Sequence, residues 1–113
     1  MVVALFAIKV CGQTPTLAAW NPKVLKAANT AADENYLTPE EKNVIFCINL
    51  VRLNPSLFEK TILQEFLDSS HISPDKWTES LKEELMGAKP MNPLRPMKDL
   101  YLEAKKHAKD MGL

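Results

Sequence analysis

The chain lacks an excess of charge of either sign. Its 113 residues include 14 lysines and arginines and 14 aspartates and glutamates, so no basic surplus attracts nucleic acid or an anionic membrane surface. We therefore expect no nucleic-acid partner. Cysteine and histidine are also scarce, with two of each. Their spacings fit no zinc pattern, and a four-ligand site would need carboxylates as well. We expect no metal site and no cofactor.

Long apolar runs are missing too. Residues 1–8 are apolar but too few to span a bilayer, so no transmembrane span is expected. The run resembles the hydrophobic region of a secretory signal, with small residues at candidate cleavage sites before Gln13 and before Ala19. The alternative is a short buried helix or strand. We interpret residues 1–18 as the remnant of a signal peptide, which predicts a protein that is secreted, extracellular or periplasmic.

Export would determine the chemistry of the two cysteines. Cys11 could be acylated as in a lipoprotein, although Lys9 stands where such sites prefer a small residue. If the signal is removed, Cys47 is left without a partner within the chain in a compartment that permits disulfides. Residues 19–37 then form a leader segment with a short helix predicted over residues 22–32, which begins with Asn21 as cap and proline at the first helical position.

The composition that is present, 46% apolar and 25% charged, is that of a globular protein. The strongest local signal is Thr38-Pro39-Glu40-Glu41, a capping box that predicts a helix start. Val44, Cys47, Ile48 and Val51 follow at helical spacing, and four more apolar residues widen this arc. The pattern predicts a helix that is buried on most sides.

Two polar residues, Asn49 and Arg52, interrupt this apolar helix on one face. A buried amide or guanidinium must find hydrogen-bond partners or cost a few kcal/mol. Spacing leaves two interpretations open: the pair tethers loop carbonyls or an acidic group, or it forms the solvated strip of the helix. Asn54-Pro55 then interrupts the helix, because a residue before proline is disfavoured in helical geometry.

Two further helices are predicted from their caps. Ser56 to Glu59 is a second capping box, opening a helix that runs to about Leu67. Ser73-Pro74 opens another helix over residues 74–86, stopped by Gly87. Between them, His71 lies in a polar loop and is interpreted as solvated. The apolar line of the later helix consists of Trp77, Leu81 and Leu85.

A proline-rich connector, residues 89–96, has prolines at every third position, which favours a stiff extended conformation. It also matches the PxxPxR pattern of an SH3 ligand, and the alternative is a rigid connector that sets the angle between two helices. The last helix is the most clearly amphipathic one. It ends at Gly112, and its apolar line consists of Met97, Leu100, Tyr101, Ala104, Ala108 and Met111.

His107 borders this apolar line, and Glu103 lies four residues before it. The pair could position an imidazole, but a Glu and a His on a helix surface are a weak catalytic signal without a nucleophile or a ligand cluster. We expect no enzymatic activity, and a small enzyme that uses these two residues is the least favoured hypothesis.

Two motifs together resemble those of one protein family. Ile48-Asn49-Leu50-Val51-Arg52-Leu53-Asn54-Pro55 is similar to the first-helix motif Ile-Asn-x-x-Arg-x-Asn-Pro of bacterial secreted proteins of the CAP superfamily (cysteine-rich secretory, antigen 5 and pathogenesis-related proteins, or SCP-like). Leu100-x-x-x-Ala104-x-x-His107-Ala108-x-Asp110-Met111 is similar to the second-helix motif. The matched residues that we expect to be structural are Asn49, Arg52, Pro55, Ala104, His107 and Asp110.

The resemblance implies an α/β/α sandwich for the complete family domain, with a cavity of two histidines and two glutamates that binds a divalent metal in some members. In the family these residues follow the second motif, so none of them can be carried over to this chain. His107 is similar to a helix histidine that is not a cavity ligand. Residues 38–113 are then interpreted as the N-terminal helical part of such a domain, with an inserted helix near residues 74–86.

For the chain as given, these patterns predict an all-α fold of four to five loosely packed helices. They also predict an exposed apolar patch that could mediate self-association. The first functional hypothesis is a non-enzymatic, N-terminal part of a secreted CAP-like protein. The second is a self-contained helical module that binds a protein partner through the Trp77 helix and the proline connector.

Overall fold

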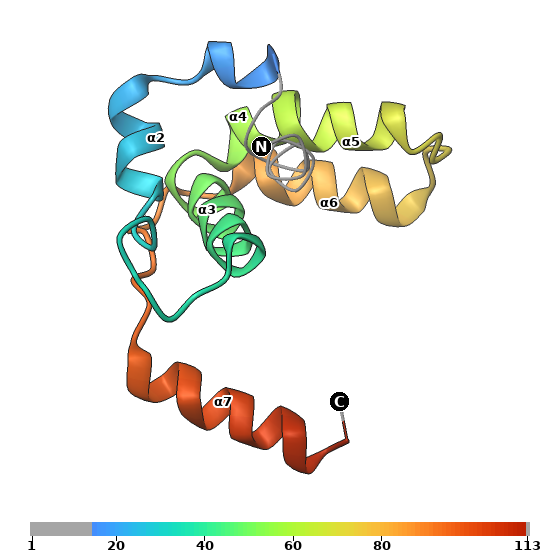
Figure 1. Cartoon of the computed structure of the whole chain (residues 1–113). Coiled ribbons are helices and arrows are strands. Elements are labelled where there is room, and N and C mark those ends of the chain that lie inside the picture. Colours follow the sequence, from blue (N-terminus) through green and yellow to red (C-terminus); the bar gives the residue numbers. More distant parts are fainter. Residues whose placement is uncertain (1–14, 113) are drawn as a thin grey trace.

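The computed structural model describes residues 15–112, and these form five helices and a short 3₁₀ turn (Figure 1). One of the five is a single rod built from three consecutive segments, one of them π-helical. The predicted all-helical, loosely packed fold is confirmed, and no strand occurs among the described residues. The elements are η1 (Pro15–Ala19), α2 (Pro22–Ala28), α3 (Pro39–Leu53), the rod α4 (Pro55–Phe58), η2 (Glu59–Leu63) and α5 (Gln64–Ser69), α6 (Lys76–Gly87) and α7 (Lys98–Asp110).

The start of α3 is the predicted capping box. The Thr38 hydroxyl accepts from the Glu41 amide at 3.2 Å, and the Glu41 carboxylate accepts from the Thr38 amide at 2.8 Å. The prediction that α3 is buried on most sides is wrong. Val44 is 56% and Ile48 42% exposed, because too few elements lie around α3 to cover its wide apolar arc.

The rod after α3 begins one residue earlier than its predicted cap. Asn54, rather than Ser56, is the N-cap: its Oδ1 atom accepts from the Leu57 amide at 3.2 Å. Pro55 lies buried at the first helical position, where its missing N–H costs nothing. A proline at this position requires the cap immediately before it. The predicted capping box at Ser56 is therefore wrong.

The predicted start of α6 is also wrong by two residues. Asp75, not Ser73, caps the helix, because its Oδ1 atom accepts from both the amide and the hydroxyl of Thr78, at 2.8 and 2.9 Å. The early helix α2 ends at Ala28, four residues before the predicted end. Both terminal glycines lie where expected: Gly87 ends α6, and Gly112 follows α7 with a positive φ of 77°.

The buried core is small. Trp20, Ala28, Leu50 and Ile62 form its centre, and the Trp20 indole N–H donates to the Thr61 hydroxyl at 3.0 Å. Residues 19–37, interpreted as a leader, therefore contribute two of the core side chains. The radius of gyration is 15.3 Å, compared with about 13 Å for a compact domain of this length. The following large apolar side chains are at least 40% exposed: Val44, Ile48, Phe66, Ile72, Trp77, Leu81, Met86, Met91, Leu94, Met97, Leu100, Leu102 and Met111.

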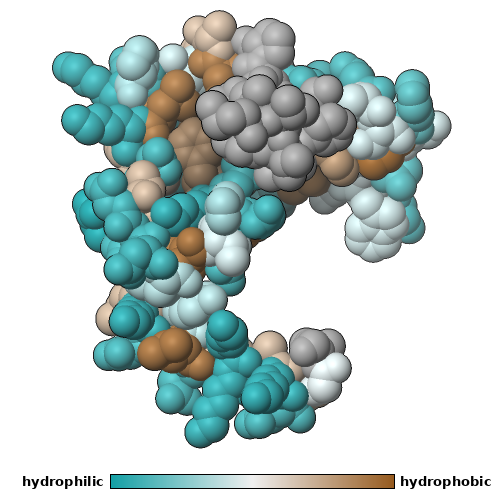
Figure 2. Space-filling view, in the orientation of Figure 1, coloured by the Kyte–Doolittle hydropathy of each residue, from teal (hydrophilic) through white to brown (hydrophobic). Residues whose placement is uncertain are grey.

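Helix α7 stands apart from the others. An open gap separates most of it from the rest of the molecule in the space-filling view (Figure 2). Among the described residues it forms no extended interface with another helix, and Leu100 and Met111 of its apolar line are each 62% exposed. No helix in the described part of the chain has the length and apolarity needed to cross a membrane.

The cap of α6 makes a prediction about pH. Hydrogen bonds from Thr78 lower the pKa of Asp75 below its ordinary value of 3.8. A lowered pKa in the folded state means that the carboxylate stabilises the fold above pH 3.8, and that this contribution is lost as the pH falls through the folded pKa. We expect the NMR signal of the Thr78 amide to shift in this acidic range in the wild type.

In the Asp75→Asn variant this shift should disappear while the cap survives, because asparagine is also a good N-cap. Ser73→Ala is the matched control and should behave as the wild type does. If Ser73→Ala instead unravelled the first turn of α6, the assignment of the cap to Asp75 would be wrong.

Candidate functional site

The first motif residue, Asn49, lies in the centre of the molecule with none of its surface exposed. Its Nδ2 atom donates to the carbonyls of Ala28 and Leu94, at 2.9 and 3.0 Å, and to the Thr30 hydroxyl at 3.1 Å. Its Oδ1 atom accepts from the Leu94 amide at 2.6 Å. The Asn49 side chain is thus a fully buried tether that joins α3 to two segments far away in sequence.

The segment tied to α3 is the proline-rich connector, which we call the strap and define as residues 88–97. Leu94 pairs with Asn49 through both its N–H and its C=O, as a neighbouring strand would. The Thr30 hydroxyl donates to the same Leu94 carbonyl at 2.6 Å. These bonds satisfy backbone groups of a segment whose prolines prevent helix formation.

Arg52 holds the strap one turn further along α3. Its Nε atom donates to the Asn92 carbonyl at 2.7 Å, and its own carbonyl accepts from the Met91 amide at 2.7 Å. Arg52 is half-buried rather than solvated. Of the two interpretations that spacing left open, tethering to loop carbonyls therefore describes both Asn49 and Arg52. The third residue of this motif, Pro55, is buried at the start of α4.

The residues of the second motif lie on α7, and none of them contributes to the hydrogen bonds around Asn49. Ala104, His107 and Asp110 are all exposed. Glu103 is exposed as well, and within the described residues no hydrogen bond or ion pair joins it to His107. The structure therefore gathers the residues of the first motif at one place and leaves those of the second on a solvent-facing helix.

An aromatic contact lies between α7 and the loop that precedes α3. The rings of Tyr36 and Tyr101 are 5.2 Å apart between centroids, tilted by 52°. The Lys105 Nζ atom lies 5.9 Å from the Tyr101 ring. Such a ring pair contributes about 1 kcal/mol beyond its buried area. Desolvation and the nearby Glu34 carboxylate both raise the pKa of Tyr36.

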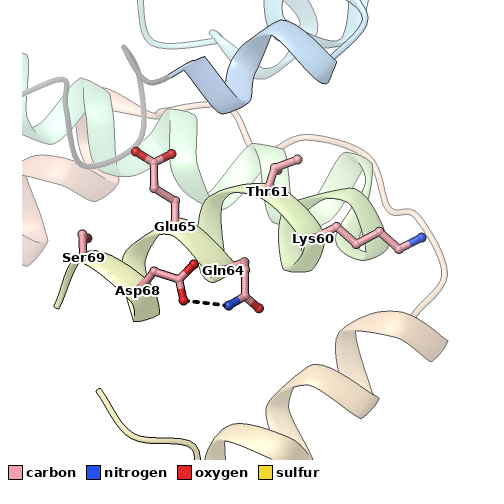
Figure 3. A pocket seen from close by; sticks show the side chains of 6 residues that line it. All are labelled: Lys60, Thr61, Gln64, Glu65, Asp68 and Ser69. Atoms are coloured by element: carbon pink, nitrogen blue, oxygen red, sulfur yellow. Dashed lines mark hydrogen bonds between the residues drawn. The ribbon is translucent and has the colours of Figure 1, made fainter. Parts of the chain in front are cut away.

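A groove that sequence reasoning missed lies along the rod (Figure 3). It is open to solvent and has a volume of about 470 Å³. Glu65 and Thr61 project to one side, while Gln64 and Asp68 lie on the other and share a hydrogen bond of 3.0 Å. In the sequence this polar helix face looks like an ordinary solvated one, so no pattern marks it as a groove. The lining residues are Lys60, Thr61, Gln64, Glu65, Asp68 and Ser69.

The groove is lined by one lysine, two carboxylates, one amide and two hydroxyls. This lining includes no histidine or cysteine, and the described residues contain no group of three or more His, Cys, Asp or Glu side chains arranged to bind a metal. The Glu65 Oε2 atom is shielded and has no hydrogen-bond partner among the described residues.

The two cysteines can be placed only in part. Cys47, on α3, takes part in a disulfide bond. The other cysteine in the sequence, Cys11, lies outside the described residues, as do most of the signal remnant and the first candidate cleavage site. The second candidate site, between Ala18 and Ala19, lies within η1. The expectation for Cys47 in a chain from which the signal has been removed stays a prediction.

The tether predicts a graded response to mutation. Asn49→Ala removes the partner of the Leu94 N–H and of the buried Ala28 carbonyl, and we expect the free energy of unfolding to fall by about 3 kcal/mol. Arg52→Ala removes one half-buried hydrogen bond and should cost about 1 kcal/mol. Urea unfolding followed by circular dichroism measures both.

The matched control is Asn35→Ala, which alters an exposed asparagine and should change stability by less than about 0.5 kcal/mol. In a double-mutant cycle, Thr30→Val and Asn49→Ala should be non-additive, because both act on the Leu94 carbonyl. Equal costs for Asn49→Ala and Asn35→Ala would contradict the tether.

No family model, curated protein or solved structure matches the chain. What the two motifs imply about function is therefore a matter for proposal.

Proposed function

We propose that this chain supplies the helical layer of a larger, secreted α/β/α domain of the CAP type, and that it acts by binding rather than by catalysis. The observation that carries the proposal is the uncovered apolar line of α7. Met97, Leu100 and Met111 on this line are each about 60% exposed. Leu100 lies on α7, and Met97 and Met111 flank the two ends of this helix.

The shape of this line suits a flat partner such as a sheet. Ala104 and Ala108 are small and lie in its middle, with larger side chains at both ends, so another element can approach closely. Burying a few hundred Å² of apolar surface at about 25 cal/mol per Å² contributes several kcal/mol, which is comparable with the whole stability of a small domain. A covering layer would therefore change the stability of this chain substantially.

The motif residues support a structural role in such a domain. Asn49 and Arg52 bond to backbone groups of the strap, so they serve to position the chain that leads into α7. The described residues do not fit the family's metal, since they include no suitable ligand cluster. Any cavity that binds a ligand would be formed by other parts of the domain.

The second candidate is a self-contained helical module that binds a protein partner. It is favoured by the exposure of apolar side chains at the start of α6. Trp77 is 72% exposed, and both Leu81, four residues later on the helix, and Ile72, which precedes it, are more than 40% exposed. Tryptophan is enriched at binding hot spots. The strap contributes less to this hypothesis, because Asn49 and Arg52 already bond to its backbone.

The CAP-type proposal predicts that more polypeptide covers α7. We would sequence the gene downstream of Leu113, express the complete product, and compare hydrogen exchange of the α7 amides with that in the 113-residue chain. We expect at least about 100-fold slower exchange in the complete product. Packing on a neighbouring layer stabilises a helix far more than its intrinsic propensity does.

Leu100→Gln should reduce this protection, because Leu100 lies on the apolar line. Leu102→Gln is the matched control: Leu102 is 49% exposed but lies on the opposite face of the same helix. A stop codon after Leu113, together with α7 amides already protected in the chain alone, would overturn the proposal. The helical module would then be preferred, and Trp77→Ala would test it by loss of partner binding.

A further inference from the structure

The strap fixes the base of α7 to the body of the molecule, which we define as η1 to α6. Backbone groups of Met91, Asn92 and Leu94 are all hydrogen-bonded to α3. Among the described residues, no hydrogen bond joins the backbone of residues 95–97 to α3, and α7 begins at Lys98. Residues 95–97, the end of the strap, therefore form a short, unpinned link between the bonded part of the strap, residues 91–94, and α7.

Beyond this link, a contact between two aromatic rings bears on the direction of α7. Tyr101, in the first turn of the helix, meets Tyr36 with 5.2 Å between ring centroids. From Leu102 to Asp110 every residue except Ala108 is exposed. A helix of 13 residues is about 20 Å long, so most of its length projects past the contact without support from the other helices described.

The loop that carries Tyr36 is held in place on both sides of this residue. Ala31, earlier in the same loop, is 1% exposed, and the Lys42 ammonium donates to the Ala32 carbonyl at 3.1 Å. The far end of the loop is fixed by the Thr38 capping box. The Tyr36 ring is thus presented to α7 from a segment that is tied to the body.

We propose that α7 is a hinged arm: residues 95–97 are the hinge, and the Tyr36–Tyr101 ring contact is the latch that sets the position of the arm. Latched, the helix is held beside the loop of Tyr36. Released, it swings about the end of the strap and changes how its apolar line is presented. This inference does not rest on the proposed function, because it concerns the chain alone.

Residual dipolar couplings of the backbone amides test the latch, because they report whether two parts of a molecule share one orientation. In the wild type we expect the couplings of α7 to fit the same alignment as those of the body. Tyr36→Ala should lower the ratio of latched to released helix by about fivefold, the effect of losing one ring pair. The couplings of α7 should then be scaled down relative to those of the body.

Tyr36→Phe keeps the ring and should behave as the wild type does. Tyr101→Ala removes the same ring contact from the α7 side, so it tests the latch even if Tyr36→Ala disturbs the loop. In the double variant α7 should be no more mobile than in either single variant, because both substitutions remove one contact. Unchanged couplings of α7 in both alanine variants would overturn the latch. Two other results would also overturn the latch. One is a wild type in which the couplings of α7 are already averaged independently of those of the body, and the other is a Tyr36→Phe variant in which α7 is as mobile as in Tyr36→Ala.

Discussion

The arrangement of this molecule depends on one buried amide. The strap contains prolines at positions 90, 93 and 96, which lack N–H groups and prevent regular helix formation. Its other backbone groups still need partners when they lie against the protein. Asn49 meets this need because its side chain carries a donor and an acceptor side by side, as a peptide group does, and it pairs with both polar groups of Leu94. The same amide reaches back to Ala28, so one side chain joins three segments.

This tether fixes where α7 begins but not where it points. The last strap residue that Asn49 holds is Leu94, and the helix starts four residues later. The remainder of the molecule consists of a small core around Trp20 and Leu50 and the elements packed upon it. The protein is therefore best understood as a body with a helix attached by a polar anchor, rather than as a bundle in which every helix shares one core.

The sequence predicted the helices better than their caps and their burial. The Thr38 start was predictable because hydroxyl, proline and glutamate agree at fixed offsets. At Ser56 and Ser73 a second cap residue lies within two positions, and local geometry decides: Pro55 selects Asn54, and the two bonds from Thr78 select Asp75. Spacing placed Asn49 and Arg52 on one face, yet the partner of Asn49 lies 45 residues away. No local pattern encodes such a distance.

The error at α3 has the same origin as the exposed line of α7. An apolar arc in a sequence states which side chains gain from burial, but burial also requires other elements to cover them. Val44 and Leu100, on different helices, each remain mostly exposed, although both belong to clear apolar patterns. A single helix with an unusual face could reflect a local feature of that helix. Exposed large apolar side chains also occur on α5 and α6, so a shortage of covering elements among the described residues explains them better than a local feature of any one helix does.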